Sequence, residues 1–223
     1  MGEAARTIGE SSEMRRGRER ATAEPYHKGN VKAGLLEAAR RLLETDTIES
    51  ITARRLCRDV GVSSANFYNH FESLEHLFME VAADGFAARA AENRRILRRG
   101  GSREEMLVQI VCNTVEFAVA EPQTFALMFG RLGDVSLSPR VTQGADESFS
   151  IIVQIIYGED LYRPEDPAQS HETCAAAYAF LAFMYGLARC YSQGLIANTS
   201  GTKAERRRFT EALARRMIAG VLA

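Results

Sequence analysis

The chain has 223 residues, of which 46% are hydrophobic, and its formal net charge at pH 7 is −1. This length and hydrophobic content predict a folded protein with a proper core. The near-zero charge excludes a uniformly basic protein that holds nucleic acid by charge alone.

The amino-terminal part predicts an arm followed by short helices. Residues 1–25 are polar, lack apolar periodicity and contain the basic cluster RRGRER, so we expect a disordered arm there. From Val31 onward, apolar side chains recur at helical spacing, which predicts a helix to about residue 44. Thr52 then suits an N-cap, and a second helix is expected over residues 53–60.

Gly61 and Ser63 predict a tight turn into a third helix. Glycine tolerates the positive φ that ends a helix, and Ser63 can cap a new helix that begins shortly after the second one ends. Two short capped helices joined by a glycine turn are typical of a helix-turn-helix unit.

The rest of the chain is also predicted to be helical. Ser73, Ser102 and Pro122 each stand where a helix can begin, and no stretch alternates like a strand. Further helices are expected over residues 139–157, 168–194 and 203–222.

The predicted fold is therefore all-α, with about nine helices in two domains. Residues 26–72 are expected to form a three-helix, helix-turn-helix DNA-binding domain. Residues 73–223 are expected to form a helical domain for effector binding and dimerisation.

The third helix separates its side chains by face. Phe67 and Phe71 share one face and are expected to pack on the first two helices. The remaining positions are small, amide-bearing or phenolic: Ser64, Ala65, Asn66, Tyr68 and Asn69. Such a surface suits the DNA major groove, although a merely solvated surface is the alternative. His70 lies nearer the core edge, where a structural histidine and a phosphate contact are both open.

Residues 31–77, with VKAGLLEAARRLLE and ITARRLCRDVGVSSANFYNHFESLEHL, resemble the DNA-binding domain of the tetracycline-repressor (TetR) family of bacterial regulators. Outside this region, YHKGN (residues 26–30) is similar to the YHHGD lead-in of one branch, and FMYGLA (residues 183–188) is similar to WHGLA in its carboxy-terminal domain. The resemblance implies a transcriptional regulator, expected to be a repressor that a small effector releases from DNA.

By position, the resemblance implies phosphate contacts for Thr52 and Arg54 in the second helix. It implies groove or backbone contacts for Ser63, Ser64, Ala65, Asn66, Tyr68, Asn69 and His70. Two positions depart from the family pattern. Leu74 stands where a phosphate-contacting lysine is usual, and Cys57 replaces a small alanine. Lys28 or the RRGRER cluster is expected to supply the missing contact.

One unit of this size reads too few base pairs for genomic specificity, so we expect a homodimer on a pseudo-palindromic operator in double-stranded DNA. The resemblance places the interface in the last two long helices. The candidate residues are Phe183, Leu187, Phe209, Leu213 and Met217. The alternative is that these helices only build the core of their own chain.

The resemblance also implies an effector pocket among the central helices, which are rich in Phe, Met and Ile. The candidate lining residues are Met106, Ile110, Asn113, Phe117, Phe125, Met128, Phe129, Phe149, Ile152 and Tyr178. An apolar lining predicts an uncharged or amphipathic effector, of aromatic or acyl character. An ordinary core is the alternative, and the protein would then be a constitutive DNA-binding or interaction module whose second domain only dimerises.

Catalytic and metal-binding motifs are absent from the sequence, which has no HExxH, GxSxG or Gly-rich phosphate loop. We therefore expect no enzyme, no cofactor and no metal. The four cysteines, Cys57, Cys112, Cys174 and Cys190, show no CxxC pairing and predict reduced thiols in a cytoplasmic protein. The most apolar run, residues 173–188, has 16 uncharged residues, which is short of the roughly 20 that a membrane span needs.

Overall fold

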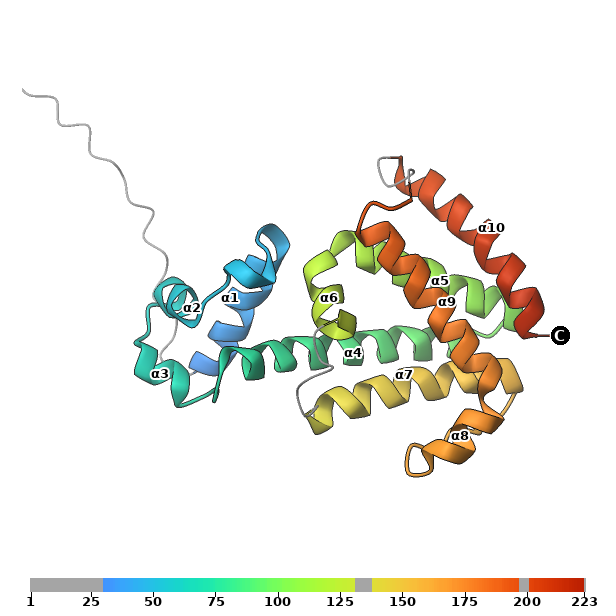
Figure 1. The fold of residues 1–223 in the computed structure, drawn as a ribbon, viewed down its shortest axis with the longest axis horizontal. Coiled ribbons are helices and arrows are strands. Elements are labelled where there is room, and N and C mark those ends of the chain that lie inside the picture. Colours follow the sequence, from blue (N-terminus) through green and yellow to red (C-terminus); the bar gives the residue numbers. More distant parts are fainter. Residues whose placement is uncertain (1–29, 131–137, 197–200, 223) are drawn as a thin grey trace, which may run out of the picture.

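The computed structural model describes residues 30–130, 138–196 and 201–222. Over these residues the secondary structure is helical, which confirms the predicted all-α class (Figure 1). A short 3-10 helix, η1 (Ile48–Ser50), accompanies ten α-helices. These are α1 (Val31–Thr45), α2 (Ala53–Val60), α3 (Ser64–Tyr68), α4 (Leu74–Arg99), α5 (Arg103–Ala120), α6 (Pro122–Gly130), α7 (Pro139–Tyr157), α8 (Pro167–Thr173), α9 (Ala175–Ser192) and α10 (Lys203–Val221).

Side-chain caps set the starts of several helices. Thr52 Oγ1 accepts a hydrogen bond from the backbone N–H of Arg55 at 3.2 Å, at the start of α2. Ser63 Oγ accepts one from the N–H of Asn66 at 3.2 Å, at the start of α3, and Ser73 caps α4 in the same way. Because the N–H groups of a first turn lack partners within the helix, these helices begin where the sequence predicted.

One predicted helix is wrong, because residues 168–194 form two helices whose axes differ by 85°. The buried Ser170 ties α8 to the loop before it: its Oγ accepts from Arg163 N at 2.9 Å and donates to Arg163 O at 2.7 Å. These bonds orient α8 along the loop instead of along α9. In the described part of the chain, no single helix is long and apolar enough to cross a membrane, and α8 and α9 reach that threshold only as a bent pair.

Buried side chains gather in two clusters. The amino-terminal cluster joins α1, α2, α3 and the first part of α4, and it includes Leu127, Met128 and Val141 from α6 and α7. The carboxy-terminal cluster joins the end of α4 to α5, α7, α9 and α10. Helix α4 contributes to both clusters and runs between them as a single rod (Figure 1).

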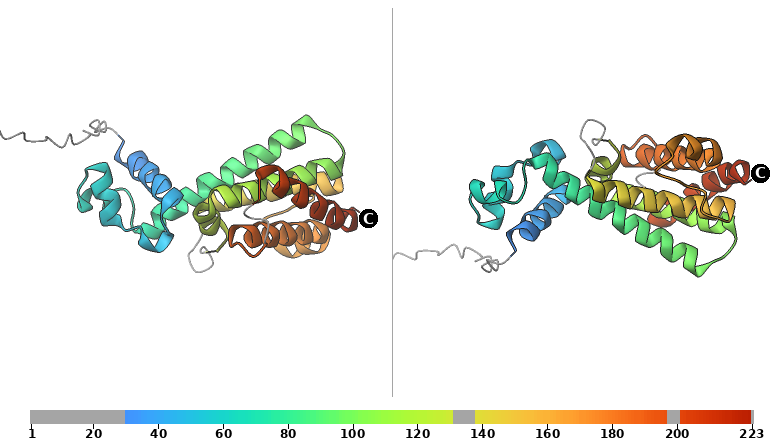
Figure 2. Two further views of the ribbon diagram at one scale, coloured as in Figure 1. Left: turned by 90° about the horizontal axis from the view of Figure 1, so that it is seen from above. Right: turned by 90° about the horizontal axis from the view of Figure 1, so that it is seen from below.

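Helix α7 lies alongside α4 in Figure 1, and the right-hand view of Figure 2 shows α7 on the near side of the molecule. Gly144 permits this close approach, since an added Cβ would lie 2.9 Å from Phe86 Cβ and 3.2 Å from Ala87 N. Contacts this short are not tolerated between packed helices, so a larger residue at position 144 would force α7 away from α4.

An ion-pair network (Arg40, Glu80, Asp84 and Arg140) connects α1, α4 and α7. Arg40 of α1 and Arg140 of α7 both donate to the Asp84 carboxylate of α4, and the Arg140 bond measures 2.8 Å. Arg140 also donates to Glu80, whose residue is only 9% exposed. The carboxylates raise the pKa of Arg140, chiefly through the hydrogen bond to Asp84. The network therefore links the helix-turn-helix unit to α7 across one face of α4.

Candidate nucleic-acid interface and ligand groove

The turn between α2 and α3 has the geometry that the sequence predicted. Gly61 adopts φ 75° and ψ 32°, in the left-handed region. Its N–H donates to the Arg58 carbonyl at 3.3 Å, and the N–H of Val62 donates to the Cys57 carbonyl at 2.9 Å. An added Cβ at Gly61 would meet no atom within 4 Å, so the requirement for glycine here is one of backbone conformation.

Gly61→Ala is therefore expected to destabilise the protein by about 1 kcal/mol, because an alanine side chain strains the left-handed backbone. Urea unfolding should show a lower midpoint with an unchanged slope. Gly220→Ala is the matched control, since Gly220 lies in α10 and an added Cβ there also meets nothing. A Gly61→Ala protein as stable as the parent would show that the turn tolerates another conformation.

Two phenylalanines hold α3 in place. Phe67 and Phe71 are buried in the amino-terminal cluster, and their ring centroids lie 5.6 Å apart. The sequence predicted both on the third helix, but α3 ends at Tyr68, and Phe71 follows it with its N–H bonded to the Phe67 carbonyl at 3.0 Å. Cys57, which replaces the alanine usual in the family, is buried beside them and fits the packing. Leu74 is half-buried against the same cluster. The inner face of α3 is therefore fixed by apolar contacts.

The predicted DNA-contacting residues lie outside this core. Tyr68 is 60% exposed, and Asn66 is half-buried. The other exposed members of the set are Thr52, Arg54, Ser63, Ser64, Ala65, Asn69 and His70. Lys28 and the RRGRER cluster lie outside the described residues. The structure thus gathers the remaining candidates on α2, α3 and the residues that follow α3.

A salt bridge between α2 and the end of α1 supports this surface. Arg55 donates two hydrogen bonds to the Asp46 carboxylate, at 2.9 and 3.0 Å, and so ties the start of α2 to the end of α1. The Arg55 guanidinium, with a further bond from Thr45, holds the pKa of Asp46 below its usual value. A two-bond pair of this kind fixes orientation as well as distance.

The predicted apolar lining residues separate into two aromatic groups. Phe125 and Phe129 have centroids 4.8 Å apart, and Phe117 lies 6.4 Å from Phe125. A second group forms around Phe149, whose ring lies 4.6 Å from that of Tyr178. Met106, Ile110 and Ile152 are buried in the carboxy-terminal cluster.

Met128 instead belongs to the amino-terminal cluster. Its Sδ would lie 2.5 Å from an added Cβ on Gly85, so this glycine makes room for the methionine against α4. The residue therefore packs where α6 meets α4, near the helix-turn-helix unit.

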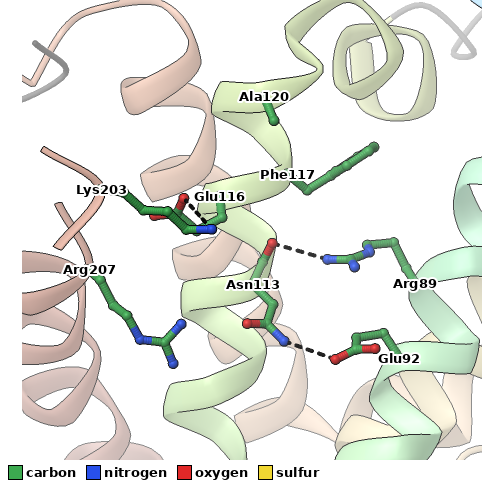
Figure 3. A pocket seen from close by; sticks show the side chains of 8 residues that line it. All are labelled: Arg89, Glu92, Asn113, Glu116, Phe117, Ala120, Lys203 and Arg207. Carbon is green, nitrogen blue, oxygen red and sulfur yellow. Dashed lines mark hydrogen bonds and ion pairs between the residues drawn. The ribbon is translucent and has the colours of Figure 1, made fainter.

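A groove of about 420 Å³ runs along α5 (Figure 3). Asn113 and Phe117, two of the predicted lining residues, are part of it. Arg89 and Glu92 of α4 lie on one side of α5, and Lys203 and Arg207 of α10 on the other, while Glu116 and Ala120 of α5 complete the lining. The groove is thus much more polar than the predicted pocket.

Arg89 is a half-buried cation of the groove. Its Nη1 donates to the Asn113 carbonyl at 3.1 Å, and its guanidinium carbon lies 5.2 Å from the centroid of the Phe117 ring. Burial lowers the pKa of Arg89 below its usual value, although Glu92 and Glu121 partly offset this effect. Beside it, the Asn113 amide donates to Glu92 at 3.2 Å.

Sequence reasoning missed six of the groove residues: Arg89, Glu92, Glu116, Ala120, Lys203 and Arg207. One signal was available, because residues 113, 116, 117 and 120 share a helical face that mixes polar and apolar side chains. The cations come from two other helices, and no spacing along the chain brings them to that face.

The predicted dimerisation residues differ in exposure. Phe209 is 40% exposed, whereas Phe183, Leu213 and Met217 are half-buried. Leu187 is buried in the carboxy-terminal cluster of its own chain. On α9 the exposed positions include Ala175, Ala179, Ala182 and Gly186, which recur at helical spacing and leave a narrow surface of small residues.

Metal-binding geometry is also absent among the described residues, which contain no group of three or more His, Cys, Asp or Glu side chains able to hold an ion. Cys57, Cys112 and Cys174 are buried free thiols, and Cys190 is half-buried. Burial raises the pKa of Cys112 to about 11, so this thiol stays protonated at neutral pH.

Two family models match the chain. "Bacterial regulatory proteins, tetR family" matches residues 35–81, and "Tetracyclin repressor-like, C-terminal domain" matches residues 107–218. The first covers the helix-turn-helix unit, and the second covers helices from α5 to α10.

Individual relatives are more distant. A nucleoid occlusion factor, SlmA from Marinomonas sp. (strain MWYL1), is 29% identical over 156 residues, which are 66% of this chain and 77% of SlmA. A protein of unknown function from Rhodococcus sp. RHA1 has a similar fold, with a TM-score of 0.66 at 22% identity, covering 87% of this chain and 98% of that one. FadR from Bacillus subtilis, in complex with stearoyl-CoA, has a TM-score of 0.57 at 10% identity, covering 86% and 97%.

Proposed function

Because the chain belongs to the tetR family of bacterial regulatory proteins and is a DNA-binding transcriptional regulator, we propose that it binds a pseudo-palindromic operator through α3. The observation that supports this mode is the exposed polar face of α3, with Phe67 on its buried side and Phe71 buried just after the helix ends. The proposed DNA-binding domain is residues 26–72, and residues 73–223 are the proposed effector and dimerisation domain.

Within the DNA-binding domain, we assign base contacts to the small and amide side chains and backbone contacts to the others. Ala65 permits close approach, and Asn69 is suited to bond adenine with both ends of its amide. Thr52, Arg54 and Tyr68 are assigned to phosphates, as are Ser63, Ser64 and His70, while Asn66 is assigned to the groove. Lys28 is assigned the phosphate contact that Leu74 cannot make.

We further propose that the protein is a homodimer built on α9 and α10. A two-fold dimer places its two α3 helices in successive major grooves about 34–36 Å apart, one turn of the duplex. The exposed Phe209 and the small residues on the outer face of α9 suit close packing against the same helices of a second copy. Such a regulator acts in the cytoplasm and needs no catalytic step or cofactor.

Release by a small effector is the proposed regulation. Helix α4 packs at one end against the helix-turn-helix unit and lines the groove farther along, and the ion-pair network joins α1 to α7 across it. A ligand that shifts α4 would therefore change the separation of the two α3 helices. The structural similarity to FadR in complex with stearoyl-CoA supports an amphipathic effector over a purely apolar one.

The second candidate is a constitutive DNA-binding module whose carboxy-terminal domain only dimerises or contacts another protein. The observation that favours this candidate is that most of the apolar residues predicted to line a pocket are buried in the two core clusters. The two candidates differ in one observable, because only the first requires a small molecule to change operator affinity.

The test begins with genomic fragments that the purified full-length chain retains, followed by footprinting of the retained sites. We expect two protected half-sites related by a two-fold axis, centred one helical turn apart. Retention without sequence preference at physiological salt would contradict the operator proposal. Operator titrations with and without candidate effectors then separate the two candidates, since linkage requires the operator to weaken effector binding by the same factor.

A further inference from the structure

We propose that the groove along α5, between α4 and α10, is a binding site for a small organic carboxylate with an apolar body. Arg89 would hold the carboxylate, and Phe117 and Ala120 would contact the apolar part. The inference deepens the proposed effector role, and its regulatory part rests on that role.

The charge of the groove favours an anion. Three cations and two carboxylates line it. Both carboxylates are already engaged: Glu116 accepts from Arg206 at 3.1 and 3.0 Å, and Glu92 accepts from Arg95 at 3.0 Å. These acids are therefore largely neutralised within the protein.

The three cations are engaged to different degrees. Arg207 donates to Glu211 at 3.1 Å, and Lys203 lies 4.0 Å from Glu116. For Arg89, the described residues provide one carbonyl partner and no carboxylate at ion-pair distance. A guanidinium presents five N–H donors in a planar fork, so Arg89 retains donors that match a carboxylate.

The shape and lining favour an organic anion over an inorganic one. Phe117 is half-buried, and its ring already contacts the Arg89 guanidinium, so an apolar wall stands directly beside the cation. Ala120 continues this wall by one helical turn. A volume of about 420 Å³ lies within the range of small-molecule sites and exceeds what a bare sulfate or phosphate fills.

The groove lies on helices that connect to the DNA-binding unit and to the proposed dimer interface. Arg89 lies on α4 five residues after Asp84, the carboxylate that binds Arg40 of α1. Lys203 and Arg207 lie on α10, one of the two proposed dimer helices. A ligand bound between these cations would contact the helix that leads to α3 and the helix that sets the distance to the second copy.

Calorimetric titration of the full-length protein, without DNA, tests the site with three probes: octanoate, octanol and sulfate. We expect octanoate to bind one site per chain, and octanol and sulfate to bind at least about tenfold more weakly. Only octanoate offers both a carboxylate for Arg89 and an alkyl chain for the apolar wall. Octanoate binding no tighter than octanol binding would overturn the role of Arg89.

Variants locate the binding. Arg89→Met keeps the apolar stem and should weaken octanoate by about tenfold or more, whereas Arg98→Met, on the exposed end of the same helix, should leave it unchanged. Ala120→Trp fills the groove from an exposed position and should abolish binding even if Arg89→Met folds poorly. Octanoate affinity that is unchanged in Ala120→Trp would refute the site.

An operator titration separates this inference from the proposed function. If octanoate binds in the groove and operator affinity stays constant, the carboxylate site is confirmed, and the proposal that its ligand regulates DNA binding is wrong. If the protein binds no operator at all, the proposed function is wrong, and the calorimetry without DNA still decides the groove.

Discussion

Phe209→Glu will dissociate the protein into monomers and remove tight operator binding. Phe209 is 40% exposed on α10, where a second copy is proposed to cover it. A buried glutamate on each side of a two-fold interface loses its hydration and faces its own symmetry mate or an apolar partner, which is strongly unfavourable. A single helix-turn-helix unit then retains mostly non-specific affinity, so operator binding should fall by about a thousandfold or more.

Sedimentation at micromolar concentration and operator titration at fixed salt measure the two consequences together. Leu195→Glu is the matched control, because Leu195 is another large apolar residue, 71% exposed, but lies beyond the end of α9. Its oligomeric state and operator affinity should equal those of the parent. A Phe209→Glu protein that remains a dimer with full operator affinity would place the interface elsewhere.

Asn69→Ala will weaken operator binding by about 1–3 kcal/mol and relax the preference at one base pair in each half-site. Asn69 is exposed at the C-cap of α3, with φ −70° and ψ −18°, so its side chain continues the helical face that carries Ala65. Truncation removes a two-bond contact to a base edge and leaves the packing of Phe67 and Phe71 intact. Unfolding stability should therefore change little.

Tyr68→Phe provides the contrast. It deletes only the hydroxyl group of an exposed ring whose centroid lies 5.3 Å from that of Phe67. A lost phosphate contact should weaken binding to operator and unrelated DNA alike, and the salt dependence should stay unchanged because the hydroxyl is uncharged and displaces no counterion. If both variants bind the operator with parental affinity, another surface reads the DNA.

Local chemistry explains why much of the DNA-binding unit was predictable. The side chains of Thr52, Ser63 and Ser73 each accept a hydrogen bond from the backbone N–H three residues further along. Gly61 ends α2 through its own left-handed backbone angles. The separation of Phe67 from Asn69 follows from the geometry of one helical turn. None of these features depends on a distant part of the chain, so the sequence alone determined the helix starts, the turn and the outward face of α3.

Tertiary structure decided the features that depend on partners far apart in sequence. Helical periodicity indicated that residues 168–194 are apolar and helical, but the bonds between Ser170 and Arg163 set the bend between α8 and α9. The same periodicity marked Met128 as apolar, yet Gly85 on another helix decided which cluster receives it. Periodicity shows which face of a helix is buried, and the partner helix determines what covers that face.

The ligand groove shows this limit most clearly. Most of the apolar residues that the sequence predicted for the pocket are buried in the two core clusters. The cations that line the groove, Arg89, Lys203 and Arg207, instead come from α4 and α10 and lie beside one face of α5. A salt bridge or a groove depends on distances of a few ångströms between residues that lie about a hundred positions apart. The sequence therefore determined the DNA-binding unit and the helical class, and only the packing of α4, α5 and α10 decided where the polar groove lies.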